Sequence, residues 1–162
     1  MNIFHLSYDP RTSARAMTNK HIVKMVVELA QLMSTAHRII DPESPFLATL
    51  YKETHRNHPS AIWTRESTGN YLWAYFHFCA LCDEYTARYH KIHKTDKDLR
   101  DILGHYPAGI KQGARTPFAM AMPDIYKKED PVQAYRHYYV KEKIKTDEDR
   151  ERYFRVLRKE MK

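Results

Sequence analysis

Three residues whose side chains could carry out acid–base or amine chemistry follow one another near the start of the chain. His21, Lys24 and Glu28 are separated by three and four positions. An α-helix turns by about 100° per residue, so this spacing places all three side chains on one face. The other faces carry apolar residues such as Val26 and Leu29, which predicts a helix largely enclosed by protein. A base, an amine and a carboxylate on such a helix predict a cleft in which Glu28 acts as a general acid or base.

The same three residues also admit a purely structural interpretation. Lys24 and Glu28 could form an ordinary ion pair one helical turn apart. His21 could be a hydrogen-bonded residue of the core. The spacing leaves both interpretations open, and we favour the cleft because the polar strip lies on an otherwise apolar helix.

The segment 19–29, with the sequence NKHIVKMVVEL, resembles the N-terminal helix of the phage pyrimidine-dimer DNA glycosylases, the endonuclease V-type UV-repair enzymes. In that family a histidine near the N-terminus is followed seven residues later by a glutamate and then a leucine. His21, Glu28 and Leu29 reproduce this spacing. The resemblance implies that Glu28 stabilises the reaction intermediate and transfers protons.

Shorter stretches extend the resemblance. AYRHYYVK at 134–141 is similar to the family's aromatic and basic Tyr-Lys-Tyr-Tyr-type stretch, and MNIF at 1–4 with HPSAIW at 58–63 resembles related tailed-phage proteins. The resemblance implies an all-α fold and a bifunctional glycosylase/lyase that acts on a damaged pyrimidine in double-stranded DNA. In such enzymes an amine attacks the sugar C1′, forms a Schiff base and permits strand cleavage. No cofactor is implied.

The identity of the attacking amine is open. The family's nucleophile is the α-amine of a small residue exposed by removal of the initiator Met, but residue 2 here is Asn, whose size disfavours that removal. The Met1 amine could still be the nucleophile, or Lys24 could supply the amine. Alternatively, the protein could keep the DNA-binding scaffold with other chemistry, as a base-modifying transferase acting on a thymine derivative or as a non-catalytic DNA-binding protein.

A second candidate contact with DNA lies at a predicted helix start, His58-Pro59. The free N–H groups of a helix start can bind a phosphate, and Arg65 could pair with one through two hydrogen bonds. Trp63 could stack on a flipped base. The alternative is that Pro59 only begins the helix and Trp63 belongs to the core.

The chain is strongly basic, with 27 Lys and Arg residues against 20 Asp and Glu residues and a formal net charge of +7. Such a charge favours an anionic partner, and we expect DNA before an anionic membrane. Tyr135, Tyr138 and Tyr139 alternate with Arg136 and His137, an arrangement typical of surfaces that bind nucleic acid. The basic residues expected to contact DNA are Arg11, Arg15, Lys20, Lys111, Arg115, Arg136 and Lys141.

Other classes of function are disfavoured by missing motifs. Cys79 and Cys82 have no second cysteine pair, and His90 and His93 lie about three turns further along the same predicted helix, so no metal site is expected. There is no Gly-rich phosphate loop and no run of about 18 apolar residues that could span a membrane. Without a secretory signal, two free thiols predict a cytoplasmic location, in the infected host if the protein is phage-encoded.

The elements that must position these residues are predicted to be helices. The expected order is a short helix from Asp9-Pro10 to about Met17, a helix over 19–40, a short helix at Pro59, an interruption at 68–70, a long helix over 71–93, a short helix from Asp96 to Gly104, an extended loop over 105–130, a helix from Asp130-Pro131 to about Lys145, and a charged helix over 146–162.

This order predicts one fold class. The chain has 162 residues, 43% of them hydrophobic and only 4 of them glycine, with no credible βαβ unit. We expect an all-α, single compact helical domain over 1–162 with long irregular loops, in which the helix at 146–162 could be peripheral. The oligomeric state is left open by the sequence.

Overall fold

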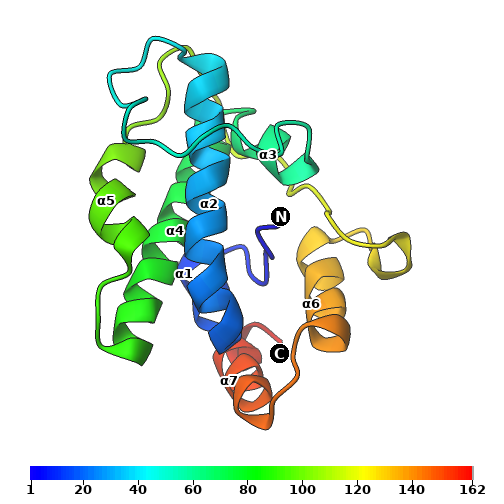
Figure 1. Ribbon diagram of the computed structural model, residues 1–162. Helices are drawn as coiled ribbons and strands as arrows, with labels where there is room; N and C mark the ends of the chain where they lie inside the picture. The colour runs from blue at the N-terminus through cyan, green and yellow to red at the C-terminus, as the bar shows by residue number, and fades with distance from the viewer. Residues whose placement is uncertain (162) are drawn as a thin grey trace.

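The computed structural model describes residues 1–161 and contains helices but no strand over that range (Figure 1). The predicted all-α fold class is therefore confirmed. None of the helices in the described range is both long and apolar enough to cross a bilayer. The elements are α1 (Pro10–Arg15), α2 (Asn19–Ile40), α3 (Pro59–Thr64), α4 (Thr68–Tyr89), α5 (Lys94–Leu103), the 3-10 turn η1 (Asp124–Tyr126), α6 (Pro131–Glu142), α7 (Asp147–Leu157) and the 3-10 turn η2 (Arg158–Glu160).

Every α-helix begins after a residue whose side chain accepts a hydrogen bond from the first turn, which satisfies one of the free N–H groups there. The predicted starts of α1, α2, α3 and α6 are confirmed, and α1, α3 and α6 carry Pro in the first turn. The capping residues are Asp9, Thr18, His58, Ser67, His93, Asp130 and Thr146.

The start of α4 differs from the prediction. Residues 68–70, expected to interrupt the chain, form the first turn of α4, which Ser67 caps. The N–H of Gly69 donates to the carbonyl of Gly113 at 2.9 Å, and a Cβ on Gly69 would lie 2.3 Å from the backbone nitrogen of Arg115. The glycine is therefore needed because a distant loop docks against the helix start, and it does not break the helix.

The end of α4 is also earlier than predicted. His90 adopts a left-handed backbone conformation with φ 58°, which ends the helix at Tyr89. His93 then caps α5, so the two histidines do not continue the helix of the cysteines. The predicted helix over 71–93 therefore joined most of α4 to the linker that follows it and to the residue that caps α5.

The core is formed where α2 and α4 pack along one another, with α1 against α4 and α7 against α1. The continuous cluster of buried apolar residues runs from Ile3 to Leu157. Tyr153 and Leu157 of α7 are buried in it, whereas Phe154 is 38% exposed. The C-terminal helix thus contributes to the common core.

The N-terminal segment lies between α2 and α6 (Figure 1). Ile3 and Leu6 are fully buried, and Arg136 of α6 donates to the carbonyl of Leu6 at 2.7 Å. The ring of Phe4 packs edge-on against Tyr139. The segment therefore brings the first residue of the chain to the face of α2 that carries the predicted polar strip.

Candidate active site

A pocket of about 150 Å³ lies beside the first residue of the chain. The pocket brings together His21, Lys24 and Glu28, which the helical spacing predicted to share one face. It also includes the N-terminus, Tyr138 of α6, and Lys143, which directly follows α6. We call it the amine pocket. Its lining residues are Met1, Asn2, Phe4, His21, Lys24, Met25, Glu28, Tyr138 and Lys143.

The central contact of the amine pocket joins an amine to a carboxylate. The Met1 amine nitrogen lies 3.3 Å from Glu28 Oε1. The side chains of Met1 and Glu28 are 3% and 10% exposed, so the pair sits in a largely desolvated environment. Glu28 Oε2 is buried and has no hydrogen-bond partner within residues 1–161. One carboxylate oxygen is thus engaged with the amine, while the hydrogen-bonding capacity of the other is unused within residues 1–161.

Asn2 fixes the position of this amine. Its Oδ1 accepts hydrogen bonds from the N–H groups of Ile3 at 2.8 Å and Phe4 at 3.1 Å, and its Nδ2 donates to the carbonyl of Ala121 at 2.8 Å. Phe4 adopts a left-handed backbone conformation with φ 58°, so the chain turns sharply here. Asn2, which stands where a small second residue was expected from the resemblance, is therefore a buried residue that holds Met1 in place.

His21 is held in its uncharged form at neutral pH. Its Nδ1 lies 2.8 Å from Tyr139 Oη, and its ring stacks on Phe4 with 4.7 Å between centroids. Burial, followed by the positive charges of Lys143 and Lys24, lowers the pKa of His21 to about 4. An uncharged imidazole at this position can exchange hydrogen bonds with a ligand without adding charge to the pocket.

Two lysines add positive charge to the amine pocket. Lys24 is exposed on α2. Lys143, immediately after α6, is half-buried, with its Nζ 5.2 Å from the ring centroid of Tyr138 and 5.9 Å from that of Phe4. Sequence reasoning missed Lys143 because its approach to Glu28 depends on how α6 packs against the N-terminal segment.

Comparison with known protein families agrees with this geometry. The family model described as pyrimidine dimer DNA glycosylase matches residues 1–98, more than half of the chain. The chain belongs to this family. Searches of curated proteins and of solved structures each found no match. The resemblance noted around His21 and Glu28 is confirmed, and the matched range contains Met1, Asn2, Phe4 and the whole of α2.

Three residues that were predicted to stack on DNA bases in this glycosylase-family protein are buried, so the structure does not expose their rings to a base. Trp63 is 2% exposed and packs edge-on against His5, Trp73 and Phe118. Tyr135 and Tyr139 are fully buried. Their hydroxyl groups are engaged with backbone groups and with His21, so these rings are structural.

Arg136 is also committed within the protein. Its side chain is buried, and its Nη2 lies 2.6 Å from the carboxylate of Glu160 in addition to the contact with Leu6. The guanidinium therefore joins the N-terminal segment to the C-terminal turn, and the structure does not expose it for the predicted contact with DNA. The exposed residues among the predicted DNA contacts are Arg11, Arg15, Lys20, Lys111, Arg115 and Lys141, while Tyr138 is half-buried in the amine pocket.

The start of α3 lies close to the amine pocket. His58 Nδ1 accepts a hydrogen bond from the N–H of Ser60 at 3.0 Å, so the histidine itself occupies part of the predicted phosphate-binding position. The pKa of His58 is lowered by burial and by the Met1 ammonium group, and Glu28 acts in the opposite direction. Arg65 is half-buried, with its Nη1 unpartnered within residues 1–161.

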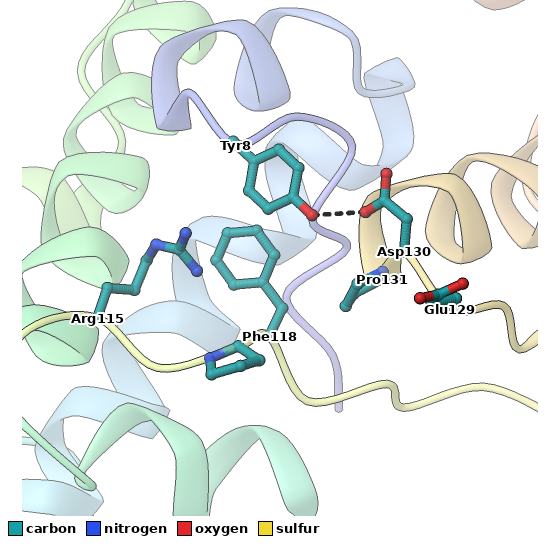
Figure 2. Close-up of a pocket in the computed structure, with 7 residues that line it drawn as sticks. Tyr8, Arg115, Phe118, Glu129, Asp130 and Pro131 are labelled. Carbon is teal, nitrogen blue, oxygen red and sulfur yellow. Dashed lines mark hydrogen bonds between the residues drawn. The ribbon is translucent and has the colours of Figure 1, made fainter.

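A larger hollow of about 550 Å³ contains the predicted DNA contact Arg115 (Figure 2). We call it the Arg115 hollow. The guanidinium carbon lies 4.4 Å from the ring centroid of Phe118 and 5.5 Å from that of Tyr8, whose Oη donates to Asp130 Oδ1 at 2.5 Å. The hollow shares no lining residue with the amine pocket. It is lined by Tyr8, Arg115, Pro117, Phe118, Glu129, Asp130 and Pro131.

The two cysteines have no chemical role that the structure supports. Both are free thiols on α4, Cys79 half-buried and Cys82 buried. Burial raises the pKa of each thiol, which disfavours the reactive thiolate. Within residues 1–161, no group of three His, Cys, Asp or Glu side chains is placed to bind a metal ion.

Proposed function

We propose that the protein is a DNA glycosylase with AP lyase activity on a damaged pyrimidine in double-stranded DNA. The Met1 amine is the nucleophile and Glu28 is the acid–base group. The observation that carries this proposal is the 3.3 Å separation between the Met1 nitrogen and Glu28 Oε1 in a largely desolvated pocket. Membership of the family supports the reaction class, and the basic surface supports DNA as the substrate.

The reaction follows from the positions of these groups. Glu28 takes a proton from the Met1 ammonium, and the resulting amine forms a bond to the sugar C1′ while the bond from C1′ to the base breaks. The base leaves with the electron pair of that bond and takes up a proton from the nitrogen that has attacked. Glu28 Oε2, which has no hydrogen-bond partner within residues 1–161, can transfer the proton held by the carboxyl group to the ring oxygen O4′, so the sugar opens and the C1′–nitrogen imine forms. A base that is flipped from the helix, or weakened by damage, would give the amine access to C1′.

The Met1 amine is a better nucleophile candidate than Lys24. Its contact with Glu28 is already formed, and the Asn2 hydrogen bonds hold the chain around it in one conformation. Lys24 is exposed, and no carboxylate of residues 1–161 lies within ion-pair distance of it. A fixed amine next to its base loses less entropy in the reaction than a mobile side chain.

Borohydride trapping on a duplex with one pyrimidine dimer tests the proposal. We expect a covalent protein–DNA adduct from the wild type and from Lys24→Met. A Gly-Ser extension upstream of Met1 moves the amine and should abolish the adduct while leaving salt-dependent DNA binding intact. Absence of an adduct from the wild type, or an undiminished adduct from the extended protein, would contradict the proposal.

Two other outcomes point to the alternative functions. Transfer of a labelled small group to DNA without strand cleavage would indicate a base-modifying transferase. If Glu28→Gln leaves the biological effect intact while salt steeply weakens binding, the protein is a non-catalytic DNA-binding protein. Each of these alternative functions would also need a reason for the contact between the Met1 amine and Glu28 in a pocket.

A further inference from the structure

We infer that Lys143 stabilises the 3′-phosphate that leaves when the DNA strand is cut. This inference deepens the proposed function and rests on it. It assigns a role to a residue outside the range that the family model matches, and it concerns strand cleavage, a later step than the attack by the Met1 amine.

Lys143 is held at the amine pocket. It is the residue directly after α6, and it lines the pocket together with Met1 and Glu28. Its Nζ lies close to the rings of Tyr138 and Phe4, which attract an ammonium group through their π-electrons. The contacts with two rings limit where the ammonium can lie, so its charge is directed to this pocket.

The charge of Lys143 is not neutralised by the protein. Within residues 1–161, no carboxylate lies within ion-pair distance of its Nζ, and Glu28 is paired with the Met1 amine. The pocket therefore holds more positive than negative charge before DNA binds. A half-buried ammonium without a carboxylate partner attracts an anion, and phosphate is the anion that DNA brings next to every sugar.

Strand cleavage after imine formation creates the charge that such an ammonium stabilises best. Glu28, which is ionised again after it has protonated O4′, accepts a proton from C2′; the C2′–C3′ double bond forms as the C3′–O bond breaks, and the phosphate leaves with the electron pair of that bond. The phosphate changes from a diester with one negative charge to a monoester that approaches two. An interaction that strengthens as charge develops accelerates the step and does not merely tighten binding.

Lys143 suits this role better than Lys24. Lys24 is exposed, so water and salt screen its charge. Lys143 is half-buried and comes from the end of α6, whereas Glu28 comes from α2. A sugar bound between these elements would have its C1′ at the Met1 amine and one flanking phosphate at Lys143.

The test uses a duplex with one abasic site, which removes base excision from the measurement. Imine formation is followed by borohydride trapping, and strand cleavage by single-turnover gel analysis. The variants are Lys143→Met, Lys143→Arg and, as the matched control, Lys145→Met, which removes an exposed charge two residues further along the same loop. Thermal unfolding of each variant checks that the fold is retained.

We expect Lys143→Met to slow strand cleavage about tenfold to a hundredfold while trapping changes less than about twofold. Lys143→Arg should keep most of the cleavage rate, and Lys145→Met should leave the ratio of cleavage to trapping unchanged. Equal loss of trapping and cleavage in Lys143→Met, or a ratio equal to that of Lys145→Met, would overturn the inference. Failure of the wild type to form an adduct would instead overturn the proposed function and, with it, this role.

Discussion

The amine pocket and the Arg115 hollow differ in what their polar groups already do. In the small amine pocket, one oxygen of Glu28 has no hydrogen-bond partner within residues 1–161, and the Met1 amine contacts the other. In the larger Arg115 hollow, Asp130 accepts hydrogen bonds from Tyr8 Oη and from the N–H of Val132. The comparison teaches that unused hydrogen-bonding capacity next to an amine is a better criterion than volume for choosing a candidate reaction site.

The Arg115 hollow is suited to holding DNA without reacting with it. Its guanidinium group is exposed and lies over two aromatic rings, and its loop docks on the start of α4 through Gly69. Such a group can contact a phosphate or stack on a base. The comparison therefore predicts that substitutions in the amine pocket reduce catalysis, whereas substitutions in the Arg115 hollow weaken DNA binding.

The largest expected effect is that of Glu28→Gln. The amide keeps the size of the side chain but cannot accept the amine proton. We expect strand cleavage to fall about a thousandfold, within the range for loss of a general acid–base group. Single-turnover cleavage of dimer-containing DNA measures it, with the exposed Glu43→Gln as control. Unchanged cleavage would make Glu28 structural and remove the distinction between the two sites.

The next effect is a loss of stability in acid caused by His21. Its pKa is about 4 in the folded protein against 6.5 as the ordinary value, so the unfolded chain binds the proton more readily. The stabilisation is complete above pH ~6.5 and is lost as the pH falls towards ~4, by up to about 3 kcal/mol. Urea unfolding at several pH values should show a shallower decline for His21→Gln. Identical curves would mean that burial does not disfavour the imidazolium.

Loss of the anchor at Asn2 should have a moderate effect. Asn2→Leu removes three hydrogen bonds but keeps a large second residue, so Met1 is retained. We expect a loss of about 1–3 kcal/mol in stability and cleavage slowed about tenfold because the amine is less well positioned. Intact mass confirms that Met1 is present, and the exposed Asn57→Leu is the control. A variant that loses stability but keeps the full rate would limit Asn2 to a structural role.

The smallest effect belongs to the Arg115 hollow. Arg115→Ala should weaken DNA binding a few-fold and reduce the slope of log affinity against log salt by about 0.9, the value for one phosphate contact. Trapping at saturating protein should not change. Fluorescence anisotropy across a salt series measures the slope. A lost adduct at saturation would place the hollow within the reaction site.

The local part of this architecture was predictable from the sequence. The polar strip on α2 depends only on helical spacing, and the Asp-Pro starts of α1 and α6 depend only on capping. Tyr135 and Tyr139 were assigned to a DNA-binding surface although they lie four residues apart and so share one helical face. The burial of both shows that helical periodicity was a better guide on α6 than the alternation of aromatic and basic residues.

The remaining parts depend on contacts between distant segments. The approach of Met1 to Glu28 requires Asn2 to bind Ala121, and Lys143 reaches the pocket only through the packing of α6. Gly69 looks like a helix break unless the docking loop is known. No local pattern encodes these contacts, because each is set by the fold as a whole.

Mapping the borohydride-reduced adduct to a residue tests the central claim most directly. The protein is trapped on dimer-containing duplex, digested with nuclease and protease, and its peptides are sequenced by mass spectrometry. The account predicts a reduced sugar remnant on the α-nitrogen of Met1, with Lys24 and Lys143 unmodified. A remnant on either lysine, or on neither lysine nor Met1, would contradict it.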